Sequence, residues 1–131
     1  MNEVALSAVI LVALAVFFLG FVWWKSKVRG LSAAQKEAIW NHWHRAVEIR
    51  DMHRRVMEGD KVLDHAMQLL GFQGSMADKL KKAGPRFSNV QVVWEAHKLR
   101  NRIAHEVNAP LSDKEASRAM AAFEKGLRDL C

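Results

Sequence analysis

Residues 32–47, SAAQKEAIWNHWHRAV, determine the fold class. Ser32 is followed three residues later by Gln35, the capping-box pattern that begins a helix near Ala33. Apolar side chains then recur at helical spacing, at Ile39, Trp40, Trp43 and Val47. The stretch therefore predicts an amphipathic helix rather than a strand.

Outward from this stretch, a second apolar register covers residues 52–70. The change of register near residues 48–52 fits either one bent helix or a break between two helices, and we expect a break. Ser75 opens a short helix, Met76–Ala83, which Gly84-Pro85 ends.

Two further capping patterns predict the C-terminal helices. Ser88 with Gln91 predicts a helix over residues 89–107, which Ala109-Pro110 ends. Ser112 with Glu115 predicts a last helix that ends near Asp129.

No stretch alternates with the period of a strand, and only two prolines and seven glycines interrupt the chain. We therefore expect an all-α protein in which residues 30–131 form one antiparallel bundle of about four main helices and one short helix. The predicted core residues are Trp43, Val47, Val56, Leu63, Met67, Leu70, Leu80, Val92, Leu99, Ile103, Met120, Phe123 and Leu127.

Residues 4–24, VALSAVILVALAVFFLGFVWW, carry no charge. A helix of 21 residues is about 31 Å long, enough to cross a hydrocarbon core of about 30 Å. The alternative is a cleaved signal peptide, but the run is long, ends in bulky residues and has no preceding Lys or Arg. We expect residues 1–29 to be a retained anchor, with its basic flank of Lys25, Lys27 and Arg29 holding the C-terminal domain in the cytoplasm.

Charge and cysteine content exclude several classes of protein. Residues 25–131 hold 20 Lys and Arg against 13 Asp and Glu, a net charge of +7. The single cysteine, Cys131, cannot form an internal disulfide or a cysteine-rich zinc site. His42 and His44 are two residues apart and so point to different faces of a helix, which does not favour a metal site. We expect no metal and no cofactor.

The functional signal lies in residues 94–106, WEAHKLRNRIAHE. On a helical wheel, Val92, Ala96, Leu99, Ile103 and Val107 share one face, which predicts the core stripe. The opposite face predicts a polar half of a homodimer interface, and it carries Trp94, Lys98, Asn101 and His105.

An Arg, an Asn and a His without a carboxylate or thiol cluster suit metal-independent cleavage of RNA. A histidine can move a proton near neutral pH, and an arginine can hold a phosphate. The RNA supplies its own nucleophile, the 2′-hydroxyl. From residue types alone, packing explains these residues more readily than catalysis does.

The run Arg100-Asn101-Arg102-Ile103-Ala104-His105 resembles the signature of the HEPN superfamily, an Arg, a polar residue and a His separated from the Arg by four to six residues. Upstream, Asp60-Lys61, Asp64, residues 82–87 and residues 94–97 are similar to small membrane-anchored bacterial proteins. The resemblance implies a helical bundle that dimerises and a ribonuclease site with Arg100 and His105 as catalytic residues and Asn101 in support. It also implies an inner-membrane protein whose partner is RNA, or a non-catalytic adaptor that binds another protein.

For the other polar residues, a structural or surface role is more plausible than a catalytic one. His97 borders the predicted core face and is expected to be a packed, hydrogen-bonded histidine. Asp60 and Asp64, one turn apart, are expected on a solvated face, with the orientation of a neighbouring Arg or His as the alternative. The cations expected to face RNA or anionic lipid are Arg54, Arg55, Lys79, Lys81, Lys82 and Arg86.

Overall fold

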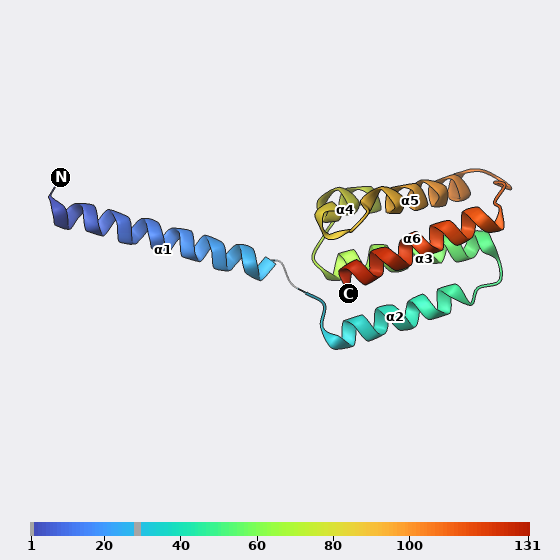
Figure 1. Ribbon diagram of the computed structural model, residues 1–131, viewed down its shortest axis with the longest axis horizontal. Helices are drawn as coiled ribbons and strands as arrows, with labels where there is room; N and C mark the ends of the chain where they lie inside the picture. Colours follow the sequence, from blue (N-terminus) through green and yellow to red (C-terminus); the bar gives the residue numbers. More distant parts are fainter. Residues whose placement is uncertain (1, 28–29) are drawn as a thin grey trace.

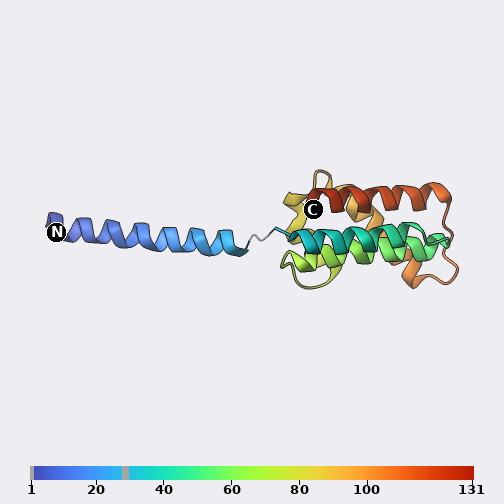
Figure 2. The ribbon, with the colours of Figure 1, turned by 90° about the horizontal axis from the view of Figure 1, so that it is seen from below.

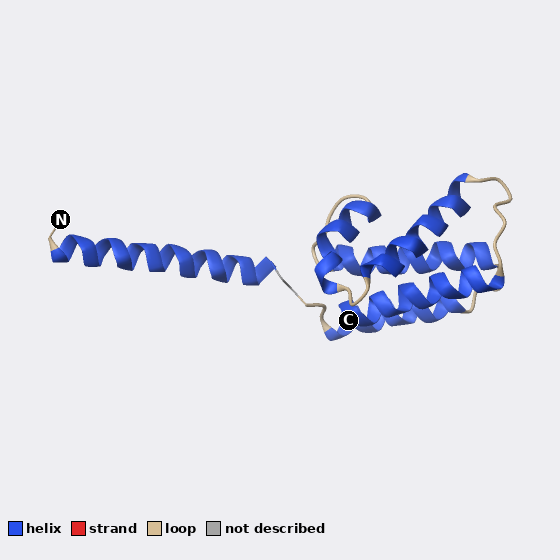
Figure 3. Ribbon diagram, turned by 45° about the horizontal axis from the view of Figure 1, so that its top comes forward, coloured by secondary structure: helices blue, strands red, loops and turns tan. Residues whose placement is uncertain are grey.

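The structure, a computed structural model, describes residues 2–27 and 30–131. Its elements are α1 (Glu3–Lys27), α2 (Ala33–Val47), α3 (Met52–Leu69), α4 (Met76–Ala83), the 3-10 helix η1 (Gly84–Arg86), α5 (Val90–His105) and α6 (Asp113–Leu130). The described residues form helices and connecting loops and include no strand (Figure 3). The all-α prediction is confirmed, and so is the break between residues 47 and 52.

Helices α3 and α6 form the centre of the bundle. In Figure 1, α2 and α5 lie on opposite sides of this pair, and the short α4 lies beside the beginning of α5. Helices α2 and α3 are antiparallel, and so are α5 and α6, as predicted, whereas α3 and α6 run in the same direction (Figure 1). Seen from below, α2, α3 and α6 run along one shared long direction (Figure 2). These three helices therefore reach from one end of the bundle to the other.

The first helix, α1, contributes nothing to the bundle core. Every described side chain from Asn2 to Trp24 is exposed. Residues Glu3–Trp24 form the single described helix that is long and apolar enough to cross a membrane. Membrane spans and signal sequences share this length and composition. The side chains of residues 25–27 and the whole of residues 28–29, where the sequence predicts a basic flank, lie outside the described part.

Side-chain caps fix the beginnings of most helices. Capping boxes are present at Ser32, Ser75 and Ser112. Hydrogen bonds from Ser75 hold the pKa of Asp78 below its ordinary value, because they favour the charged carboxylate. The capping box predicted at Ser88 is wrong. Both the amide and the hydroxyl of Ser88 donate to Asp129 of α6, and α5 begins after Asn89 without a side-chain cap.

The core lies mainly between α3 and α6 and extends to α2, α4 and α5. Nine predicted core residues are buried: Trp43, Val56, Leu63, Met67, Leu70, Leu80, Met120, Phe123 and Leu127. Val47 was expected there but is exposed, because α2 ends at this residue. Three others on α5, Val92, Leu99 and Ile103, are only half-buried.

Helix α5 is rotated about its axis relative to the predicted stripe. Its fully buried residues are Val93, Ala96 and His97. Val107, expected at the end of the core stripe, follows the helix and is 92% exposed. The helical wheel assigns the most apolar positions to the core face. In the structure, a polar residue, His97, occupies part of the face that is buried. This rotation determines which side chains of α5 meet α3.

Gly59 lets α3 and α6 approach closely. A Cβ atom added at Gly59 would lie 2.8 Å from Sδ of Met120 and 3.0 Å from Cδ2 of Phe123, both on α6. Real Cβ contacts are essentially never shorter than 3.0 Å. The glycine therefore costs helix propensity but permits the packing of the two central helices.

We expect Gly59→Ala to lower the free energy of unfolding by about 1 kcal/mol. Alanine gains about 1 kcal/mol of helix propensity, but overpacking of a core costs about 1–3 kcal/mol. Urea unfolding would measure the change. Gly126→Ala is the matched comparison, because its nearest contacts, 3.3 Å from Leu63 and Phe87, need only a small shift. A Gly59→Ala protein more stable than wild type would contradict the close approach.

Candidate functional site

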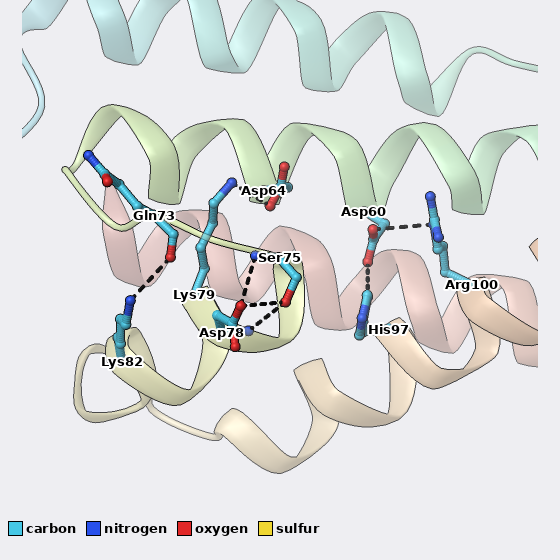
Figure 4. A network of polar contacts seen from close by, with 9 residues as sticks. All are labelled: Asp60, Asp64, Gln73, Ser75, Asp78, Lys79, Lys82, His97 and Arg100. Atoms are coloured by element: carbon cyan, nitrogen blue, oxygen red, sulfur yellow. Dashed lines mark hydrogen bonds and ion pairs between the residues drawn. The ribbon is translucent and has the colours of Figure 1, made fainter.

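A polar network lies where α5 packs on α3. The buried face of α5 presents His97 to α3, one turn after Val93. Opposite it, Asp60 of α3 is 4% exposed. The His97 Nδ1 atom lies 2.8 Å from Oδ1 of Asp60 (Figure 4). An ionised carboxylate only accepts hydrogen bonds, so Nδ1 carries a proton and donates a hydrogen bond to Asp60.

Arg100 makes the second contact with Asp60. Its Nε atom lies 3.5 Å from Oδ2 of Asp60, an ion pair rather than a hydrogen bond (Figure 4). The guanidinium is held from its other side, since Nη1 donates to Oδ1 of Asn101 at 3.2 Å. The Arg100 side chain is 32% exposed. None of the described residues accepts a hydrogen bond from its Nη2 atom, which leaves that atom free for a ligand.

Asn101 closes the network into a ring of four residues. Its Nδ2 atom lies 3.3 Å from Nε2 of His97. With the proton of His97 on Nδ1, the Nε2 atom is a free acceptor, so Asn101 donates to it. Hydrogen bonds thus pass from Arg100 to Asn101, to His97 and to Asp60, and the ion pair joins Asp60 back to Arg100. We call these four residues the polar ring.

The polar ring forms one wall of an open cleft. The cleft has a volume of about 450 Å³ and lies between α3, the beginning of α4 and α5. Besides the ring, it is lined by Lys61, Asp64, Gly74, Ser75, Met76 and Ala77. Lys61 donates to Glu58 at 3.1 Å and lowers the pKa of that carboxyl group, chiefly through this bond. The cleft therefore presents a fixed guanidinium and one lysine beside two carboxylates.

His105 lies away from this cleft. It is the last residue of α5 and is exposed. Its side chain makes no hydrogen bond or ion pair with any residue that the structure describes, and it does not line the cleft that Arg100 lines. Of the three predicted catalytic residues, a single chain thus brings Arg100 and Asn101 together and leaves His105 apart.

The predicted dimer face is only partly exposed. Lys98 and His105 are exposed, and Asn101 is half-buried. Trp94 was expected opposite the core, but it is half-buried and packs against the core. Its ring meets that of His97 edge-on, with centroids 6.3 Å apart. The rotation of α5 brings Trp94 toward the core, so this residue does not by itself indicate a dimer.

The six predicted basic residues do not share one environment. Lys79 is 6% exposed, and its Nζ atom lies 2.9 Å from Oδ1 of Asp64 (Figure 4). Lys79 therefore cannot face RNA or lipid as expected. Arg55 is also engaged, since it donates to the carbonyl oxygens of Ile49 and Arg50. The exposed members are Arg54, Lys81 and Lys82, and Arg86 is half-buried beside the ring of Phe72.

The two histidines considered as metal ligands, His42 and His44, both contact other side chains. His42 lies 3.5 Å from Glu58 across the α2–α3 interface. The ring of His44 lies 6.4 Å from that of Trp40. Among the described residues, no group of three or more His, Cys, Asp or Glu side chains has the arrangement of a metal site.

The sequence favoured the wrong environment for Asp60. The expectation that Asp60 and Asp64 lie on a solvated face is wrong, because Asp60 is buried in the ring and Asp64 pairs with the buried Lys79. The alternative, that Asp60 orients an Arg or a His of a neighbouring helix, is correct. The prediction that His97 is packed and hydrogen-bonded is confirmed. The missed signal was the position of Asp60 beside Gly59, between buried Val56 and Leu63.

Comparison with protein-family models, with curated proteins and with solved structures finds no match to this chain.

Proposed function

We propose that this protein is a membrane-anchored, HEPN-like helical domain that binds RNA and cleaves it as a homodimer without a metal ion. The observation that carries the proposal is the fixed position of Arg100. Asp60 and Asn101 hold its guanidinium at the edge of the cleft, and Nη2 remains free. A guanidinium oriented in this way can donate from Nη2 to a phosphate oxygen and place its positive charge beside the phosphate.

The proposed reaction uses Arg100 as the phosphate clamp and His105 as the proton-transfer group. His105 removes the proton from a 2′-hydroxyl, whose oxygen attacks the adjacent phosphorus. The bond to the 5′-oxygen of the next nucleotide breaks, and that oxygen takes up a proton from water. Arg100 stabilises the charge that develops on the phosphate. The products are a 2′,3′-cyclic phosphate and a free 5′-hydroxyl.

In this proposal, a second copy of the chain brings Arg100 and His105 close together. Arg100 and His105 are about 140° apart around α5, so one helix does not bring them together. If two copies of α5 pack antiparallel across a two-fold axis, Arg100 of one copy can approach His105 of the other. The exposed Lys98 and His105 lie on the face that such packing would cover.

A cleavage assay tests this proposal. Residues 30–131 should cut single-stranded RNA in the presence of a chelator, and a fully 2′-deoxy substrate should resist. Mass spectrometry of the products should find cyclic or 3′-phosphate ends. A requirement for a divalent ion, or products with 5′-phosphate ends, would exclude the mechanism.

A second candidate is a non-catalytic adaptor that binds another protein. The observation that favours it is a groove of about 360 Å³ between α5 and α6. Its floor is apolar, with Val92, Leu99 and Ala119, and its rim carries charges of both signs. An intact dimer that cuts no RNA, and whose binding to a partner protein is lost on Leu99→Glu, would favour this candidate.

We also propose that α1 is a retained span of the inner (cytoplasmic) membrane and that residues 30–131 face the cytoplasm. The support is the uncharged run followed by Lys25, Lys27 and Arg29. A reporter enzyme that works only in the cytoplasm should be active when it is fused after Cys131. The mature protein should keep its N-terminus. Periplasmic reporter activity, or cleavage near Lys25, would contradict this topology.

A further inference from the structure

The chain between α1 and α2 is short. The span ends at Trp24 and helix α1 at Lys27, whereas α2 begins at Ala33. Even when fully extended, the connection from residue 27 to residue 33 covers at most about 20 Å. The end of the bundle at which α2 begins must therefore stay near the membrane surface if α1 is inserted.

Contacts between distant segments define this end, which we call the proximal pole. The last turn of α6 meets the first half of α2 there, since Arg128 lies over the ring of Trp40 at 5.3 Å. The same turn meets the beginning of α5 through the bonds of Ser88 to Asp129. Helix α4 and η1 lie at this end too (Figure 1). The proximal pole thus joins the start of α2, the end of α3, α4, η1 and the end of α6.

At the proximal pole, exposed lysines outnumber the carboxylates that are free to form ion pairs with them. Lys81, Lys82 and Lys125 are exposed, and none of them is ion-paired with a described residue. The Nζ atom of Lys82 reaches only the carbonyl oxygen of Gln73, at 3.3 Å (Figure 4).

The acidic side chains of the pole are largely engaged. Asp78 completes the capping box of Ser75, and Lys81 and Lys82 also interact with its charge. Asp129 accepts two bonds from Ser88, and Glu124 pairs with Arg128. Glu37, near the start of α2, is exposed and makes no ion pair with a described residue.

We propose that the proximal pole is a lipid-binding surface, on which Lys81 and Lys82 engage the headgroups of anionic phospholipids and hold the bundle against the bilayer. The tether favours lipid over RNA as the occupant, because it keeps this pole beside the membrane whatever else binds. An anionic bilayer attracts each nearby Lys by about 1 kcal/mol, a factor of about five. The proposal rests on the retention of α1 and not on RNA cleavage.

The test places a fluorophore beside the two lysines in the full-length protein. Gln73→Cys, in a Cys131→Ser background, provides a single label site next to Lys82. The protein is reconstituted in nanodiscs whose lipids carry a nitroxide quencher in the headgroup. Discs with anionic phosphatidylglycerol should quench the label strongly. Purely zwitterionic discs, or high salt, should quench it much less.

Reversal of two charges tests whether Lys81 and Lys82 are the residues that bind the lipid headgroups. Lys81→Glu with Lys82→Glu should shift the ratio of docked to undocked bundle in anionic discs by at least about ten-fold. The matched control is Arg45→Glu with Arg50→Glu, two exposed cations at the opposite end of the bundle, where α2 ends. This control should leave the quenching unchanged. Circular dichroism should show equal helix content in all variants.

Three outcomes would overturn the proposal. One is equal quenching in anionic and zwitterionic discs. Another is an equal effect of the two charge reversals. The third is that Lys81→Glu with Lys82→Glu abolishes binding of single-stranded RNA while quenching stays unchanged, which would assign the surface to nucleic acid. A protein that does not remain with the discs would instead contradict the retained span.

Discussion

Asp60→Ala should lower the free energy of unfolding of the bundle by about 3 kcal/mol. Asp60 is buried and holds both His97 and Arg100. Without it, the Nδ1 proton of His97 has no acceptor, and the guanidinium loses its counter-charge. Removal of one partner from a buried pair costs about 3–5 kcal/mol, and the partial exposure of Arg100 reduces that cost. Urea unfolding of residues 30–131 would measure the change.

Two variants separate the contributions in this prediction. Asp60→Asn keeps an acceptor for His97 and removes the charge near Arg100, so it should cost less than Asp60→Ala. Glu95→Ala removes an exposed carboxylate from α5 and should change the free energy by no more than about 0.5 kcal/mol. If Asp60→Ala is as harmless as Glu95→Ala, the buried network does not stabilise the bundle.

His105→Ala should lower the rate of RNA cleavage by a factor of about 10² to 10⁴, the usual effect of removing a positioned acid–base group. Arg100→Ala should lower it by about 10² to 10³, the usual effect of removing a group that stabilises the charge of the transition state. His105 is exposed and makes no bond within the described chain, so His105→Ala should leave stability unchanged. Arg100→Ala should also destabilise the bundle somewhat, because Asp60 then loses its ion pair. Asn101→Ala should reduce cleavage less than either.

Mixing the two inactive variants tests the composite site. In a heterodimer, one site has Arg100 from the His105→Ala copy and His105 from the Arg100→Ala copy, and the other site has neither. Random exchange of subunits should therefore restore about a quarter of the wild-type sites. If neither protein gains activity on mixing, although they exchange subunits, the site does not combine two chains. Full activity of His105→Ala would exclude it as the proton-transfer group.

Local signals in the sequence predicted most of the fold. Ser32, Ser75 and Ser112 each carry a partner three residues later, and each begins a helix as expected. Ser88 has the same pattern with Gln91 but bonds to Asp129, 41 residues away. A capping pattern cannot predict such a tertiary bond, because the competing acceptor comes from a distant part of the chain.

The candidate site was harder to predict because it contradicts the hydrophobic pattern. The helical wheel placed Leu99 and Ile103 in the core, but the buried positions of α5 include His97. A buried histidine is stable there because Asp60, on another helix, accepts a hydrogen bond from its Nδ1 atom. Sequence spacing on α5 alone holds no information about Asp60. Arg100 and Asn101 were identified, and the orientation of an Arg or a His by Asp60 was only the less favoured alternative. Its contacts with His97 and Arg100 became visible only in three dimensions.

The polar ring also constrains how the sequence can diverge. Each residue of the ring contacts the residue before it and the residue after it. A single substitution therefore removes a bond from two neighbours at once. Tolerated changes at positions 60, 97, 100 and 101 should therefore occur together, and paired substitutions should be non-additive. Among diverging relatives, these four positions should covary as one unit, either kept as a set or replaced together by apolar residues of similar volume.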